Sequence, residues 1–253
     1  MKEWRFIPLE NKEDSYMKMA TEEAIMSSVR EKSSLPTLRF YSWKNPAVSL
    51  GFFQDAKKEL NLEECKKNNV EIFRRITGGG AVYKSPLYEI NYSLIIREDD
   101  SIIPKDVEKS YALICDGIIV GLKKLGFQTT FKPINDILFN NKKVSGNAQT
   151  RVDNVILHHG TILLKPESEE MFKYLKIDDS KLLEKKVKSA KDLVCGLYDY
   201  KVFTKEEIID SICKGFKEVF NITLVKSNLT EKEKLMAKEL YFKYCDEKFI
   251  FWK

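Results

Sequence analysis

The sequence predicts an α+β protein in which helices flank a mixed or antiparallel β-sheet. Three observations support this fold class. The first hundred residues contain β-rich runs separated by turn residues, a strong helical period follows near the middle of the chain, and two capping boxes precede helical patterns near its end. The chain has 253 residues, 43% of them hydrophobic. This is enough to bury a core, and without a repeat or linker we expect one domain over residues 1–253.

The first part of the chain predicts a helix followed by strands. Residues 16–30 place apolar side chains three and four positions apart, which is typical of an amphipathic helix. Residues 37–43 and 47–53 are β-rich runs, and the Asn45-Pro46 pair between them marks a turn, so we expect two adjacent strands. The next predicted elements are a short helix at 59–69 and strands at 70–74 and 90–96.

The second part of the chain begins with its strongest helical signal. Apolar residues recur at helical spacing over 107–125, and Gly126 stands where a C-terminal cap is expected. Residues 136–146 then predict a hairpin, because Asn140-Asn141 tolerates the positive φ of a two-residue turn.

The last predicted strand and two helices complete the fold. Residues 155–164 are apolar on both faces, which favours a strand in the centre of the sheet. Thr204 and Thr230 are each followed three residues later by a glutamate, so we expect closing helices within 204–253.

Charge and cysteine usage exclude several classes of protein. The 43 basic and 38 acidic residues give a formal charge of +5, and the lysines are scattered, which indicates solvated surface better than a nucleic-acid interface. The N-terminus lacks the apolar core of a signal peptide, and no apolar run could span a bilayer. The five cysteines form no C-x-x-C pair, so we expect neither disulfides nor zinc, and a cytoplasmic protein.

A glycine-rich segment is the first candidate for chemistry. Residues 74–83 read Arg-Arg-Ile-Thr-Gly-Gly-Gly-Ala-Val-Tyr. Three glycines let the backbone approach a ligand and turn its N–H groups toward an anion, and paired arginines supply positive charge. A flexible turn after an edge strand is the competing interpretation, and the spacing matches neither a Walker loop nor a dinucleotide-binding loop.

The predicted hairpin and the strand after it contain three further candidates. Asn135-Asp136 could hold Mg²⁺, although the pair is also an ordinary turn. Lys143 is followed by small residues and could neutralise charge on an acyl-phosphate oxygen, or be a solvated strand lysine. His158 and His159 are the only histidines, and because strand neighbours point to opposite faces, they cannot chelate one metal ion together.

The order and spacing of these segments resemble the lipoate-protein ligase A branch of the biotin/lipoate protein ligase family. The matching segments are Arg74–Tyr83, Asn135-Asp136-Ile137, Lys142–Ala148 and His158–Leu164, and weaker similarity covers most of the chain. The resemblance implies a fold like the catalytic domains of class II aminoacyl-tRNA and biotin synthetases, with a largely antiparallel sheet.

The resemblance also implies an activity: lipoate is activated by ATP and Mg²⁺ to lipoyl-adenylate, and the lipoyl group then passes to a lysine of a carrier domain. The implied carriers are the 2-oxoacid dehydrogenase E2 subunit and the glycine cleavage H protein. Lys143 would be catalytic, and Asp136 would lie near Mg²⁺. The residues implied to bind lipoate or adenylate are Arg75, Thr77, Gly78, Gly79, Gly80, Ala81, Val82, Tyr83, Asn135, Asp136, Gly146, Ala148, His159, Gly160 and Thr161.

Two departures from the family pattern affect this expectation. Lys84-Ser85-Pro86 stands where such ligases commonly have His-Asp, and the chain reaches Lys253 without the usual small C-terminal accessory domain. We therefore expect a separate small accessory protein, and poor adenylation by this chain alone.

Two alternatives remain open. An octanoyltransferase of the same fold would need no ATP and would use a cysteine shortly before the hairpin, yet residues 129–133 contain none. A non-catalytic module that binds an adenylate or a nucleic acid is the other alternative. Retention of Lys143 and Asp136 argues against it, as does the lack of an aromatic and basic stripe.

Overall fold

A computed structural model of the chain describes residues 1–176 and 193–253. Its main element is a sheet of eight strands in the order β11-β1-β2-β6-β10-β9-β8-β7. The bounds in that order are Ile222–Lys226, Lys2–Glu10, Thr37–Tyr41, Glu89–Arg97, Val155–Leu163, Lys142–Val152, Asp136–Phe139 and Thr129–Lys132. The pairs from β2 to β7 are antiparallel, whereas β1 pairs parallel with both β11 and β2. The predicted fold class, a mostly antiparallel sheet flanked by helices, is confirmed.

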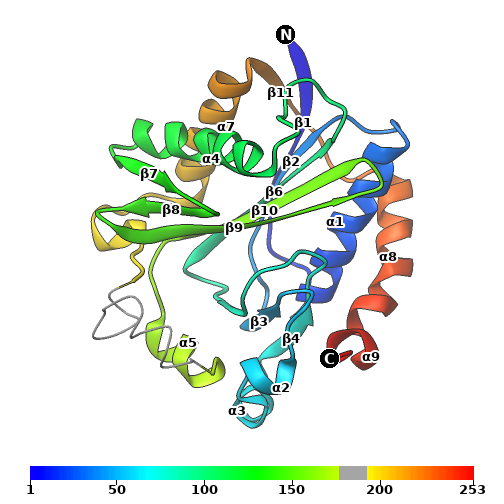
Figure 1. Cartoon of the computed structure of the whole chain (residues 1–253), viewed down its shortest axis with the longest axis vertical. Helices are drawn as coiled ribbons and strands as arrows, with labels where there is room; N and C mark the ends of the chain where they lie inside the picture. The colour runs from blue at the N-terminus through cyan, green and yellow to red at the C-terminus, as the bar shows by residue number, and fades with distance from the viewer. Residues whose placement is uncertain (177–192) are drawn as a thin grey trace.

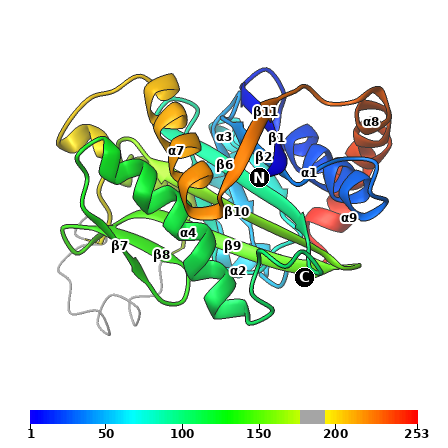
Figure 2. The ribbon, with the colours of Figure 1, turned by 90° about the horizontal axis from the view of Figure 1, so that it is seen from above.

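A second sheet of three strands has the order β4-β3-β5, with bounds Glu71–Arg74, Ala47–Leu50 and Val82–Lys84. The described helices are α1 (Ser15–Arg30), α2 (Ala56–Glu59), α3 (Leu62–Lys67), α4 (Val107–Lys124), α5 (Ser168–Tyr174), α7 (Lys205–Phe220), α8 (Glu231–Cys245) and α9 (Glu247–Ile250). Helices α4 and α7 lie on one side of the large sheet, and α1 with α8 lies on the other (Figures 1 and 2). No described helix is both long and apolar enough to cross a bilayer.

The two-residue period of the central strands sends alternate side chains to these two layers. On β6, Leu94 belongs to the core beneath α4 and α7, while Ile95 packs with Ile25 of α1. On β10, the His158 ring lies against Tyr111 of α4, and His159 contacts Glu22 of α1. The prediction that the two histidines face opposite sides is therefore confirmed.

Local signals fix several element boundaries as predicted. Asn140 and Asn141 have φ values of 49° and 61° at the turn between β8 and β9, and Gly126 has a φ of 95° beyond the end of α4. Thr204 and Thr230 each accept a hydrogen bond from the backbone N–H three residues on, at the starts of α7 and α8. These caps begin the two helices where the sequence predicts.

The expectation that residues 37–43 and 47–53 form adjacent strands is wrong. Strand β2 pairs with β1 and β6 in the large sheet, whereas β3 pairs with β4 and β5 in the small one. The turn at Pro46 therefore carries the chain from one sheet to the other. The predicted helix at 59–69 is also split, because Leu60 is extended between α2 and α3.

Candidate active site

A cavity of about 350 Å³ lies where the small sheet faces β6, β9 and β10, a volume typical of small-molecule sites. Its walls are largely apolar; they include Met19, Trp43, Phe73, Tyr83, Leu163 and Met171. Among the residues that the sequence predicts, those that line this cavity are Arg75, Gly79, Gly80, Ala81, Val82, Tyr83, Asn135, Lys143, Gly146, Ala148, His159, Gly160 and Thr161. The structure thus brings segments far apart in the sequence to one cavity.

Three predicted residues stand behind the cavity wall. Thr77 shares a hydrogen bond with the His159 ring, the Gly78 carbonyl accepts one from Arg75, and the Asp136 carboxylate pairs with Lys143. Each contacts a side chain that lines the cavity.

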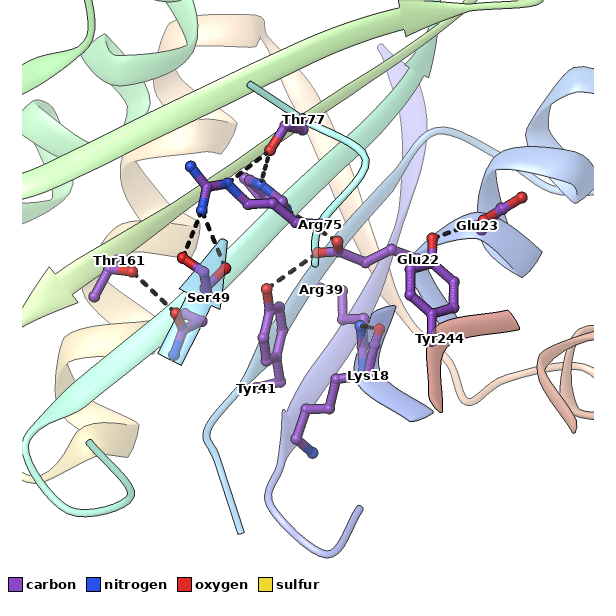
Figure 3. Close-up of polar contacts among 12 residues, drawn as sticks. Lys18, Glu22, Glu23, Arg39, Tyr41, Ser49, Arg75, Thr77, Thr161 and Tyr244 are labelled. Carbon is purple, nitrogen blue, oxygen red and sulfur yellow. Dashed lines mark hydrogen bonds and ion pairs between the residues drawn. The ribbon is translucent and has the colours of Figure 1, made fainter. Parts of the chain in front are cut away.

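The Arg75 guanidinium holds the glycine-rich loop together. Its Nε donates to Thr77 Oγ1 at 3.1 Å, and Nη1 donates to the carbonyl and hydroxyl of Ser49 (Figure 3). Its Nη2 donates to the carbonyl oxygens of Gly78 and Gly80 at 2.8 and 2.9 Å. Burial lowers the pKa of Arg75 to about 10. These five hydrogen bonds make Arg75 a brace for the loop in addition to a lining residue.

Glycine is required where this loop crosses β3. Gly79 has a φ of 99°, which side chains of L-residues rarely adopt. A Cβ on Gly51 would lie 1.9 Å from the Gly79 carbonyl oxygen. The backbone at Gly51 and the backbone at Gly79 are therefore in direct contact. This contact is possible because neither glycine has a side chain.

A directional series of hydrogen bonds connects the loop to α1. Thr77 Oγ1 accepts from Arg75 and lies 2.8 Å from His159 Nε2, and the Glu22 carboxylate on the other side of the ring can only accept. His159 Nδ1 therefore donates to Glu22 Oε2 at 3.0 Å, and in the neutral ring Nε2 accepts from the Thr77 hydroxyl. The other Glu22 oxygen accepts from Tyr41 at 3.1 Å (Figure 3).

Sequence reasoning missed Glu22 and Tyr41. Glu22 is fully buried, yet it lies within an ordinary amphipathic helix, and its partner His159 comes 137 positions later. The only available signal was His159 itself, because an imidazole buried in an apolar strand requires a polar partner.

Lys143 presents the most accessible ammonium group paired with a carboxylate at this site. Its Nζ lies 2.6 Å from Asp136 Oδ1, and the two side chains are 37% and 26% exposed. A Cβ on Gly146 would lie 2.6 Å from Nζ, so the lysine crosses the space that glycine leaves free. The Lys143 backbone bonds to Leu193 and Cys195, beside a register shift between β8 and β9.

Lys84, the residue that departs from the family pattern, is a second lysine in the cavity wall. It is only 8% exposed, and its ammonium bonds to Asn91 Oδ1 and Thr161 Oγ1 and lies 3.6 Å from Glu89 Oε1. Glu89 also accepts hydrogen bonds from Trp43 and Asn91. Burial lowers the pKa of Lys84.

The donor set around Asp136 does not fit a protein-held metal ion. Magnesium sites in proteins use oxygen ligands, but the carboxylate here is paired with the Lys143 ammonium. No three His, Cys, Asp or Glu side chains gather into a possible metal site in the described part of the chain. His158 lies on the far side of the sheet, where burial lowers its pKa to about 3.

Comparison with known proteins finds one family model and several relatives that match most of this chain. The family model for the lipoyl protein ligase A/B catalytic domain matches residues 14–217. Octanoyltransferase LipM of Clostridioides difficile is 35% identical, with 98% of each chain covered, and LipM of Staphylococcus aureus is 30% identical, with 99% of each covered.

Solved structures with the same fold include lipoate ligases. A bi-partite lipoate protein ligase from Thermoplasma acidophilum superimposes with a TM-score of 0.87 at 29% identity, covering 99% of this chain and 97% of that one. A lipoate-protein ligase A bound with ATP gives a TM-score of 0.85 at 26% identity, with 99% of both chains covered.

These comparisons correct the expected reaction. The expectation of ATP-dependent lipoate ligation is wrong, because relatives that match this chain over nearly its full length are named octanoyltransferases. The expected ATP and Mg²⁺ cofactors lose their support with it, and so does the separate accessory protein. The alternative of a non-catalytic binding module does not fit, because the family and the named relatives are enzymes. Ligase structures and octanoyltransferase sequences both match this chain over nearly its full length, so the segments they share could not decide between the two activities. By its family match, its relatives and its fold, the chain belongs to the lipoyl protein ligase A/B catalytic-domain family.

Proposed function

We propose that this chain transfers an octanoyl group from a thioester on acyl carrier protein to a lysine of a lipoyl domain, without ATP. The names of its relatives support octanoyl transfer. The observation that carries the proposal is the combination of an apolar cavity and the half-exposed Lys143 ammonium in its wall.

Each part of the site suits one part of the reaction. The apolar walls, with Trp43 and Leu163, suit a hydrocarbon chain and keep water from the acyl group. When the acceptor amine attacks the acyl carbon, negative charge develops on the carbonyl oxygen. The Lys143 ammonium stabilises that charge, which makes it the catalytic residue of this proposal.

The glycine-rich loop, braced by Arg75, forms one wall of the acyl site, and His159, Gly160 and Thr161 form another. Residues 1–253 act together as one catalytic domain, since α8 packs along α1, the helix that carries Glu22. The acceptors are lipoyl domains of 2-oxoacid dehydrogenase E2 subunits and the glycine cleavage H protein.

The purified chain tests this function directly. It is incubated with octanoyl-acyl carrier protein and an E2 lipoyl domain in the absence of ATP, and the intact mass of the lipoyl domain is measured. We expect a gain of one octanoyl group, and none on a lipoyl domain whose acceptor lysine is replaced by arginine. Modification that occurs only from free octanoate with MgATP would overturn the proposal.

A further inference from the structure

Arg74, the first of the two adjacent arginines, has no role in the proposed function. Adjacent residues of an extended segment point to opposite sides, so Arg75 faces the cavity and Arg74 faces away from it. Arg74 is nevertheless fully buried, and its hydrogen-bond partners are backbone carbonyl oxygens of two separate segments. An arginine placed in this way joins two parts of the backbone.

The two segments are the end of α9 and the turn that follows β3. Arg74 Nε donates to the carbonyls of Phe249 and Ile250 at 3.2 and 2.9 Å, which are among the carbonyls that a helix end leaves unpaired. Arg74 Nη1 donates to three carbonyl oxygens of the turn, those of Gly51, Phe52 and Gln54, at 2.9, 2.9 and 2.8 Å. Arg74 therefore holds α9 against this turn, and Figure 1 shows α9 beside β4, the strand that ends in Arg74.

Trp252 connects the same two segments at the surface. Its Nε1 donates to the Phe52 carbonyl at 3.1 Å, and its ring centre lies 5.5 Å from that of the Phe52 ring. The guanidinium carbon of Arg74 lies 5.7 Å from the centre of the Trp252 ring, within the range of a cation–π contact. The ring thus helps to hold a cation whose Nη2 has no hydrogen-bond partner among the described residues. We call residues 247–252 the clamp segment.

The turn that the clamp segment holds is in direct contact with the glycine-rich loop. The Phe52 N–H donates to the Thr77 carbonyl at 2.8 Å, and the backbone at Gly51 contacts the backbone at Gly79. Gly79 in turn lines the cavity. The clamp segment is therefore connected to the wall of the acyl site through a single turn of the backbone.

The glycine-rich loop needs such support, because consecutive glycines lose more conformational entropy on ordering than other residues do. Arg75 fixes the loop from the cavity side, and the turn after β3 fixes it from outside the cavity. An incoming acyl chain binds an ordered loop at a lower cost in free energy than a loop that it must first order. Docking of the clamp segment therefore bears on acyl binding.

We propose that the clamp segment positions the glycine-rich loop, so that docking of this segment on the turn and binding of an acyl chain in the cavity strengthen each other. The inference rests on the proposed function only for the identity of the acyl group. Arg74 and Trp252 are positioning residues, since neither of them lines the cavity. Coupling between two binding events is reciprocal, so an acyl chain in the cavity must stabilise the docked clamp segment by the factor by which docking favours the acyl chain.

Binding of octanoate to the purified chain, measured by isothermal titration calorimetry without ATP, is the first test. We expect Trp252→Ala to bind octanoate roughly fivefold more weakly than the wild type. Trp252→Phe keeps an aromatic ring but loses the Nε1 donor, and it should recover part of the affinity. Phe242→Ala is the matched control, because it removes an exposed aromatic ring from α8, and it should bind octanoate as the wild type does. Equal affinities in Trp252→Ala and the wild type would overturn the inference.

Hydrogen exchange in the wild type tests the reverse direction and requires no variant to fold. The amides of Ile250 and Phe251 are hydrogen-bonded to the carbonyls of Asp246 and Glu247, so they exchange only when the clamp segment opens. Saturating octanoate should slow their exchange roughly fivefold and leave the exchange of β11, at the far edge of the large sheet, unchanged. Protection of the loop amides of residues 77–82 without protection of Ile250 and Phe251 would contradict the coupling.

Octanoate probes the cavity whatever the donor of the acyl group is. Weaker binding by Trp252→Ala, together with no transfer from octanoyl-acyl carrier protein by the wild type, would overturn the proposed function and leave the clamp segment standing. Absence of octanoate binding by the wild type would overturn the acyl site, and this inference with it.

Discussion

Two lysine–carboxylate pairs line or border the same cavity, and they differ in their exposure to solvent and in the number of groups that hold the ammonium. Lys143 and Asp136 form a pair with side chains 37% and 26% exposed, whereas the Lys84 and Glu89 side chains are 10% and 3% exposed. The Lys84 ammonium is further held by Asn91 and Thr161 and lies 5.6 Å from the centre of the Trp43 ring. The Lys84 ammonium is fixed by several partners and supports the cavity wall. The Lys143 ammonium has one ion-pair partner among the described residues, so it can turn toward a substrate.

Removal of Lys84 should have the largest effect, and it should act on stability. Lys84→Met leaves the Glu89 carboxylate buried without its cation, so we expect the free energy of unfolding to fall by about 3–5 kcal/mol. Urea denaturation measures this change. Lys165→Met, which removes an exposed lysine from the same cavity wall, should change stability by less than about 0.5 kcal/mol.

A second substitution sharpens this result. Lys84→Met combined with Glu89→Gln keeps an acceptor for the Trp43 N–H but leaves no unpaired charge, so much of the lost stability should return. If the double variant is no more stable than Lys84→Met, the loss does not come from the buried carboxylate.

Removal of Lys143 should instead act on the reaction. Lys143→Ala should fold normally but transfer octanoyl groups roughly 10²-fold more slowly, because one preorganised cation is lost from the acyl oxygen. The rate of lipoyl-domain octanoylation measures the effect. Lys142→Ala is the matched control on the preceding residue and should transfer at nearly the wild-type rate. Equal rates in the two variants would remove Lys143 from the mechanism.

Gly146→Ala should produce a smaller loss of the same kind. The new Cβ would come too close only to the flexible end of Lys143, with Asp136 Oδ1 at an ordinary contact distance of 3.8 Å, so the ammonium moves while the strand stays, and we expect a roughly tenfold slower transfer. The double variant Gly146→Ala with Lys143→Ala should be no slower than Lys143→Ala alone. An additive loss would show that Gly146 acts on the substrate independently of Lys143.

The smallest effect concerns a buried pair far from the cavity, between Arg5 of β1 and Glu233 of α8. Burial alone would raise the pKa of Glu233, but the two hydrogen bonds from Arg5 hold it below its ordinary value of 4.5. A carboxylate with a lowered folded-state pKa stabilises the protein above pH 4.5 and loses that contribution as the pH falls further.

We therefore expect the stability of the wild type to fall more steeply between about pH 5 and pH 3 than that of Glu233→Gln. Denaturation at a series of pH values measures the difference. The glutamine retains the capping position at the start of α8, so helix formation is not the variable. Parallel pH profiles would mean that the pair contributes nothing through proton binding.

Local rules were sufficient for some parts of the fold and insufficient for others. The Asn140-Asn141 turn and the caps at Thr204 and Thr230 depend on residues within three positions of one another, and all three were predictable. The pairing of β2 and β3 was not, because the partner of a strand lies elsewhere in the sequence.

The site shows the same division. The glycine-rich loop and Lys143 were found because they break the local pattern of their segments. Glu22 was not, since a glutamate in an amphipathic helix is unremarkable until the fold places it beside His159. The reaction type could not be predicted, because this chain resembles both ligases and transferases over nearly its full length.

The empty space above Gly146 also has a genetic consequence. An added methyl group there disturbs only the tip of one lysine, so the altered chain would still fold, accumulate and bind its carriers. A cell that makes both forms would then contain slower copies that compete with fully active ones for the same lipoyl domains.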